Sequence, residues 1–209
     1  MKHFRPARRL GIPSLLLLLA MLTGPVSAAT LRWTGAHGTS SDWSRGANWD
    51  TSTAPADGDI LVFPAGAARL ANNNDLTGLR VATIRFNGAG GGYTLSGNSV
   101  VVTDGINANN TAGNNTIALA GLTLANPMSF TVAQVGLSLV IDSEVRLNGN
   151  DLNVNPTGSL VLRGVIRGEG NVIKTGDGLL TLSGPVDNTF TGDHLVNAGT
   201  VELDKGTIG

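Results

Sequence analysis

The histidines are the side chains most able to move a proton near neutral pH, and the chain has three: His3, His37 and His194. A general base needs a carboxylate to orient it and a nucleophile beside it. Asp193 precedes His194, but successive side chains of a strand point to opposite faces, so the two cannot cooperate there. The chain also contains no Gly-x-Ser-x-Gly elbow. We therefore expect no catalytic residue, and His194 is interpreted as a packed or surface histidine.

Carboxylates are the second group that could do chemistry. Parallel β-helix lyases and glycoside hydrolases align acids and cations on one outward strand face, a coil or two residues apart. A register of about twenty residues places Arg167 over Asp187, which is interpreted as an ordinary surface ion pair. Asp142 and Glu144 share a face but have no cation partner that repeats. A polysaccharide lyase or hydrolase fragment remains an alternative, while the favoured prediction is that the protein is not an enzyme.

Aromatic rings could bind a ligand in the segment 31–70. All three tryptophans of the chain lie there, at Trp33, Trp43 and Trp49. Pyranose faces pack on aromatic rings, so the three indoles could form a platform that binds a glycan. This glycan-binding module is kept as an alternative to a purely structural role.

Metal and cofactor chemistry find little support in the composition. Cysteine is absent, so the chain has no disulfide and no Cys-ligated zinc. Asp57 and Asp59 could ligate calcium, but no third acid follows at loop spacing, and they are interpreted as a turn before a strand at 60–63. We expect no metal and no cofactor.

The stretch from Gly164 to Leu203 repeats itself about every twenty residues. Leu160 and Leu162 recur as Leu180 and Leu182, and again as Val201 and Leu203. A unit this short cannot bury its own apolar face, so its neighbours must stack into a continuous core. Alternating apolar positions and β-branched residues indicate strands, while glycines and asparagines indicate turns. The fold class predicted is all-β, a parallel β-helix, right-handed by the crossover rule for parallel strands.

Two motifs in this stretch resemble a known family. Residues 164–184 read G-x-I-x-G-x-G-x-V-x-K-T-G-x-G-x-L-T-L-S-G, and residues 190–203 read F-T-G-x-x-x-V-N-A-G-T-V-x-L. They resemble the autotransporter-associated β-strand repeat, or passenger-associated transport repeat, of bacterial passenger domains. The departures are Leu179, Asp193 and His194. The resemblance implies a structural or adhesive surface protein whose repeat aids passage across the outer membrane and folding there.

The segment 29–70 is predicted to be a separate N-terminal region. Asn48 before Trp49, then Pro55, Asp59 and Phe63, resembles the leading segment found ahead of such repeats in secreted bacterial proteins. The first coil of a solenoid exposes its apolar cross-section and unpaired strand edges. Large rings folded over that end would cover both, so an aromatic cap is favoured over the sugar platform.

The first 28 residues have the three parts of a secretory signal peptide: a basic start, an apolar run at 15–19, and Val26-Ser27-Ala28 before the predicted cut. The apolar run is shorter than the roughly twenty residues that a bilayer requires. The predicted localisation is therefore secreted or cell-surface.

Residues 71–209 are predicted to form the coils, about six of them over 81–209. Asparagines at stacked turns are expected to bond to equivalent asparagines one coil away.

The formal net charge of −1 favours neither nucleic acid nor an anionic membrane as a binding partner. Host or environmental glycans or proteins are the expected partners. Because neither a C-terminal barrel nor an end cap is visible before Gly209, we expect a truncated product or another polypeptide that covers the open edge and supplies any translocator.

Overall fold

The computed structural model describes Met1 and residues 28–206. The signal peptide expected over 1–28 lies outside the described residues, apart from its two end positions. The described chain consists of strands and one short 3-10 helix, η1 (Gly46–Asn48), with no α-helix. None of its helices has the length and apolar character needed to cross a membrane. The strands are β1 (Thr30–Arg32), β2 (Ile60–Pro64), β3 (Ala71–Asn74), β4 (Arg80–Gly88), β5 (Thr94–Gly97), β6 (Val100–Asn110), β7 (Asn115–Leu119), β8 (Gly121–Leu124), β9 (Met128–Val132), β10 (Ser138–Ile141), β11 (Glu144–Arg146), β12 (Leu152–Pro156), β13 (Ser159–Leu162), β14 (Ile166–Gly168), β15 (Val172–Lys174), β16 (Leu179–Gly184), β17 (Thr189–Phe190), β18 (His194–Val196) and β19 (Thr200–Lys205).

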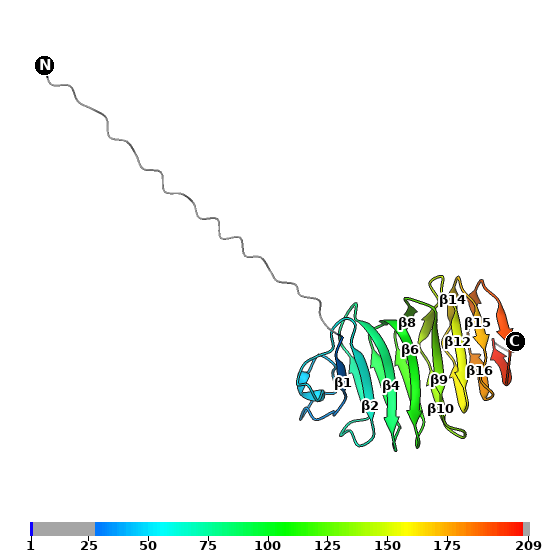
Figure 1. Ribbon diagram of the computed structural model, residues 1–209, viewed down its shortest axis with the longest axis horizontal. Coiled ribbons are helices and arrows are strands. Elements are labelled where there is room, and N and C mark those ends of the chain that lie inside the picture. The colour runs from blue at the N-terminus through cyan, green and yellow to red at the C-terminus, as the bar shows by residue number, and fades with distance from the viewer. Residues whose placement is uncertain (2–27, 207–209) are drawn as a thin grey trace.

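The strands wind into stacked coils with three faces. One face is the seven-stranded sheet in the order β19-β16-β13-β10-β7-β5-β3. The other two faces, β17-β14-β11-β8 and β9-β12-β15-β18, join through the long strands β4 and β6. Every pairing between these named strands is parallel, and the coils follow one another along the long axis of the molecule (Figure 1). The predicted parallel β-helix is confirmed.

The core is a set of columns in which each inward residue lies over its equivalent in the next coil. Such a column needs an apolar residue at the same place in every coil, which is why leucine, valine and isoleucine alternate with polar residues along the strands. One column runs through Leu31, Leu61, Ile84, Ile106, Phe130, Val154, Lys174 and Val196. All members from Leu31 to Lys174 are buried. The stack therefore shares one continuous core.

Coil length varies more than the sequence repeat indicates. On the seven-stranded face, successive core positions are Asn72, Leu95, Ile117, Ile141, Leu162, Leu182 and Leu203. Only the step from Leu162 to Leu182 has the length read from the repeat; every other step is longer, and the step from Ile117 to Ile141 is the longest. Six strands of this face, from β5 to β19, lie within 81–209, in agreement with the six coils expected there, and β3 adds a seventh strand ahead of them. Turns absorb the extra residues while the strands keep their register.

Strand β3 forms against local propensity, because its sequence is Ala71 followed by three asparagines. Asn72 occupies a core position and is buried, yet its amide is satisfied: Oδ1 accepts from Trp43 Nε1 at 2.7 Å, and Nδ2 donates to the main chain of Leu70 at 3.3 Å. A buried polar group is tolerated when its hydrogen bonds are made. Tertiary partners, which a propensity argument does not see, place this segment in the sheet.

Asparagines at the turns connect coils, but not as the expected ladder of like side chains. Asn74 Nδ2 donates to the main-chain oxygen of Asn98 at 2.9 Å, and Asn98 Nδ2 donates to that of Leu76 at 3.2 Å. Asn148 Nδ2 likewise reaches the main-chain oxygen of Leu124 at 3.3 Å. Because coil lengths differ, these three asparagines meet turn carbonyls of the neighbouring coil rather than equivalent asparagines.

Candidate functional site

The three tryptophans form one buried cluster. Trp33 and Trp43 are 0% exposed and Trp49 is 2% exposed. The rings of Trp33 and Trp49 meet edge to face, with centroids 5.1 Å apart and planes at 80°, and Trp43 meets Trp49 in the same way at 6.1 Å. Phe63 of β2 lies within 6.3 Å of all three rings. Edge-to-face pairs are a favoured aromatic geometry, so this is a packed core rather than an open surface.

Each indole N–H of the cluster is also satisfied inside the protein. Trp33 Nε1 donates to the main-chain oxygen of Arg69 at 2.7 Å, and Trp49 Nε1 donates to that of Trp43 at 2.9 Å. Trp43 Nε1 bonds to Asn72, as described above. A sugar platform needs an exposed ring face, and these rings as they lie offer none. The site residues proposed from the sequence are brought together, but inside the protein.

A buried asparagine organises residues 29–70, here called the head, around the three indole rings. Asn48 is fully buried; its Nδ2 donates to the main-chain oxygens of Ser40 and Asp42 at 3.1 and 3.0 Å, and its Oδ1 accepts from the main-chain nitrogen of His37 at 2.9 Å. The main chain of Asp42 in turn bridges to Asn73 of β3 in parallel. The head is therefore tied to the first coil of the seven-stranded face.

The Asp57 and Asp59 carboxylates serve the turn before β2, as expected. Asp59 Oδ1 accepts from the main-chain nitrogen of Ala29, and its Oδ2 accepts from that of Ala56, both at 2.8 Å. Asp57 Oδ1 accepts from the main-chain nitrogen of Arg80 at 2.9 Å. Within residues 28–206, no three histidine, cysteine or acidic side chains gather as a metal site would require.

His37 and His194, the two histidines within residues 28–206, lie far apart along the stack. His37 belongs to the head, where its Nδ1 accepts from the main-chain nitrogen of Ser40 at 3.1 Å. His194 lies in β18, over Val172 of the preceding coil. Its Nε2 is buried without a hydrogen-bond partner in the described part of the chain, and burial lowers the pKa of the ring. His194 is thus a member of an apolar column, in keeping with the packed histidine expected.

Lys174 is the polar residue whose position the sequence reasoning missed. It occupies the core column between Val154 and Val196 and is fully buried. Its Nζ donates to the main-chain oxygens of Gly176 and Ala198, the latter at 3.2 Å. Burial lowers the pKa of the ammonium, and nearby Asp177 opposes that shift. Lys174 lies two residues after Val172, and residues two apart on a strand share a face. This spacing indicates from the sequence that Lys174 faces the core.

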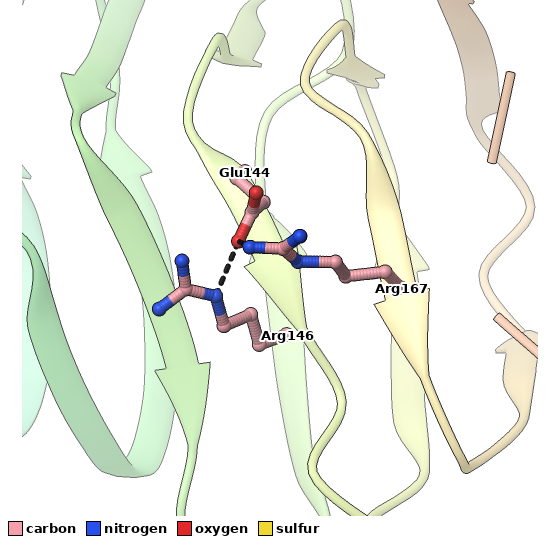
Figure 2. Close-up of polar contacts among 3 residues, drawn as sticks. All are labelled: Glu144, Arg146 and Arg167. Atoms are coloured by element: carbon pink, nitrogen blue, oxygen red, sulfur yellow. Dashed lines mark hydrogen bonds and ion pairs between the residues drawn. The ribbon is translucent and has the colours of Figure 1, made fainter. Parts of the chain in front are cut away.

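The main charged cluster of the outer surface lies on β11 and β14. Glu144 Oε1 accepts from Arg146 Nε and forms an ion pair with Arg167 Nη2 at 2.5 Å (Figure 2). Arg163 pairs with Asp142, with 3.5 Å between Nη1 and Oδ1. Asp142 and Glu144 thus each pair with an arginine of the next coil.

The predicted pairing of Arg167 with Asp187 is wrong. Arg167 lies over Thr189, because the step between these two coils is longer than the repeat length from which the pairing was read. The arginine instead turns back one coil to Glu144. A fixed spacing of about twenty residues therefore predicts the wrong acid as the partner of Arg167.

Comparison with known proteins adds one finding. Residues 172–203 match the family described as Passenger-associated-transport-repeat. No curated protein and no solved structure matches the chain. The matched residues run from the start of β15 into β19, and pair in register with β12 and β13 of the preceding coil. The chain therefore carries a passenger-associated transport repeat at residues 172–203, built into the C-terminal coils of a parallel β-helix.

Proposed function

We propose that the chain is a structural and adhesive passenger-type segment of a bacterial surface protein, and that its repeat assists passage across the outer membrane and folding there. The observation that carries this proposal is the position of the matched repeat. It is not an appended module, since its strands continue all three faces of the stack. A repeat that extends the same core can serve as a template on which neighbouring coils pair.

A structural role also agrees with how the acids of the described chain are used. Asp142 and Glu144 are neutralised by arginines, while Asp57 and Asp59 accept main-chain N–H bonds that hold a turn. A glycosidase needs two carboxyl groups free to act on one bond. We therefore favour a protein without catalytic activity over a lyase or hydrolase fragment.

The head is proposed to be the N-terminal cap of the stack. Phe63 joins the tryptophan cluster to Phe86 and Tyr93 of the first coils, with centroids 5.6 and 5.4 Å apart. The same cluster lies over the end at which β1 is the outermost strand of its face. Covering that end would keep the first coil from pairing with other chains.

The repeat family implies a secreted or cell-surface protein. Export through the N-terminal signal peptide remains part of the proposal. An outer-membrane translocator would come from another polypeptide or from a C-terminal part of a longer chain. Glycans or surface proteins of a host or the environment are the proposed partners, met by the outward faces of the coils.

Two deletions of equal length test the role of the repeat in transport. Removing 183–203 takes away one coil within the repeat, and removing 142–162 takes away one coil outside it, both in register. The full chain and both deletions are joined to one outer-membrane translocator, and the fraction reached by external protease is measured. We expect the first deletion to lower that fraction several-fold and the second to leave it nearly unchanged. Equal loss from both would refute a special role of the repeat.

A further inference from the structure

We propose that the hollow between Arg146 and Arg167 binds the anionic group of an acidic saccharide, either a uronate carboxylate or a sulfate ester. The inference rests on the proposed adhesive role of the outward coil faces and gives that role a site and a ligand class. Two arginines lie side by side on paired strands, and neither strand pairing nor core burial requires this arrangement of charge.

The two arginines lie directly opposite one another on paired strands. Arg146 of β11 and Arg167 of β14 are register partners. Neighbouring strands are about 4.8 Å apart, and like charges directly opposite each other destabilise a sheet. Glu144 lies between the guanidinium groups and supplies one negative charge for two positive ones (Figure 2). One positive charge is left over, and a bound anion would balance it.

The guanidinium groups keep most of their donors available. Both contact the same carboxylate oxygen, Glu144 Oε1, through Arg146 Nε and Arg167 Nη2. Within residues 28–206 neither guanidinium has another hydrogen-bonded protein partner. Each arginine side chain is 46% exposed. A planar guanidinium binds carboxylate or sulfate oxygens through two parallel N–H donors, so each arginine retains an edge suited to an anion.

A hollow of about 240 Å³ lies against these groups. Its lining residues are Thr123, Arg146, Asn148, Arg167 and Gly168. The threonine hydroxyl and the asparagine amide can bond sugar hydroxyls beside the anionic group. The volume is below the roughly 300–1,000 Å³ of pockets for drug-sized ligands, so the hollow suits one sugar unit of a longer chain.

The surroundings favour a saccharide over a peptide or a nucleic acid. An extended peptide usually binds by adding a strand to a free sheet edge. Here β11 pairs with β8 and β14, and β14 pairs with β11 and β17, so no edge is free. Nucleic acid binding needs many neutralised phosphates, whereas this cluster has one net positive charge on a chain of formal charge −1.

The test measures binding by titration calorimetry on the full-length protein. The probes are a galacturonate trisaccharide, a sulfated galactose trisaccharide without uronate, and a neutral galactose trisaccharide. Work at about 0.01 M ionic strength keeps screening weak. We expect one or both acidic probes to bind and the neutral probe not to bind; the stronger of the two acidic probes identifies the anionic group.

Three variants locate the site. Arg146→Gln with Arg167→Gln is expected to weaken binding at least about tenfold, because two charge-assisted pairs are lost. Arg163→Gln removes the same kind of side chain, 53% exposed, from outside the hollow and is expected to change nothing. Glu144→Gln is expected to strengthen binding several-fold, because the internal competitor for the guanidinium edges loses its charge. A purely structural ion cluster would not predict this gain.

Thermal unfolding of each variant shows whether it is folded, and Glu144→Gln gives an answer even if the double variant is unstable. The inference is refuted if neither acidic probe binds, if Glu144→Gln fails to strengthen binding, or if the double and control variants bind alike. It is also refuted if a hexaglutamate peptide or a thymidine oligonucleotide binds as tightly as the acidic sugars. Failure here with the deletion result intact would refute this site and leave the proposed passenger role standing.

Discussion

Replacing Trp43 with alanine is expected to lower the free energy of unfolding by about 3–5 kcal/mol, the usual cost of truncating a buried large aromatic residue. The side chain is fully buried, packs against Trp49 and Phe63, and donates its indole N–H to Asn72. The variant loses these contacts and also leaves the buried Asn72 oxygen without that donor. Guanidinium denaturation followed by tryptophan fluorescence measures the change.

Val135→Ala provides the control for Trp43→Ala, since Val135 is 81% exposed and its loss should change stability by less than about 0.5 kcal/mol. The same experiment separates the two interpretations of the tryptophans. A cap predicts loss of stability in Trp43→Ala. A sugar platform predicts instead a stable fold that has lost glycan binding, and that result would contradict the packed cluster described here.

Replacing Gly164 with alanine is expected to cost about 3 kcal/mol or more, because overpacking costs of this order arise where backbone must move. A Cβ on Gly164 would lie 1.8 Å from the main-chain oxygen of Ser143 and 2.4 Å from its carbonyl carbon. Both atoms belong to the backbone of the neighbouring coil, so relief requires separating the coils. Urea denaturation, or failure to obtain folded protein, reports the effect.

Gly38→Ala is the matched control for Gly164→Ala. Nothing lies within 4 Å of a Cβ built on Gly38, so the added methyl group should be nearly neutral. If both alanine variants were equally stable, the coils that carry Ser143 and Gly164 could not be in the contact seen here, and the close stacking of the chain would be disproved.

The last coils could be predicted from the sequence because stacking imposes the same residue types at equivalent positions. Leu160, Leu180 and Val201 are register partners, as the repeat indicates. Buried apolar residues also alternate with more exposed ones along strands such as β7 and β9, and this alternation is visible in the sequence. These features follow from backbone pairing and core burial, which act on every coil in the same way.

The parts that could not be predicted depend on contacts between specific coils. Turns of different length shift the register, so Arg167 meets Glu144 rather than Asp187. Strand β6 continues through Asn109 and Asn110, although asparagines are typical of turns, because β4 and β9 pair with its second half. Lys174 enters the core because main-chain oxygens, one of them in the next coil, accept its donors. Spacing within one coil does not contain this information.

Disulfide trapping in a chain without native cysteines tests the stacked register most directly. Thr181 and Glu202 are register partners whose side-chain oxygens lie 3.4 Å apart, and partners on neighbouring strands, about 4.8 Å apart, suit a disulfide. Under mild oxidation Thr181→Cys with Glu202→Cys should cross-link rapidly. Thr181→Cys with Asp204→Cys, about 8 Å apart and further along the same face of β19, should not. Rapid cross-linking of the second pair and not the first would contradict the parallel β-helix on which this account depends.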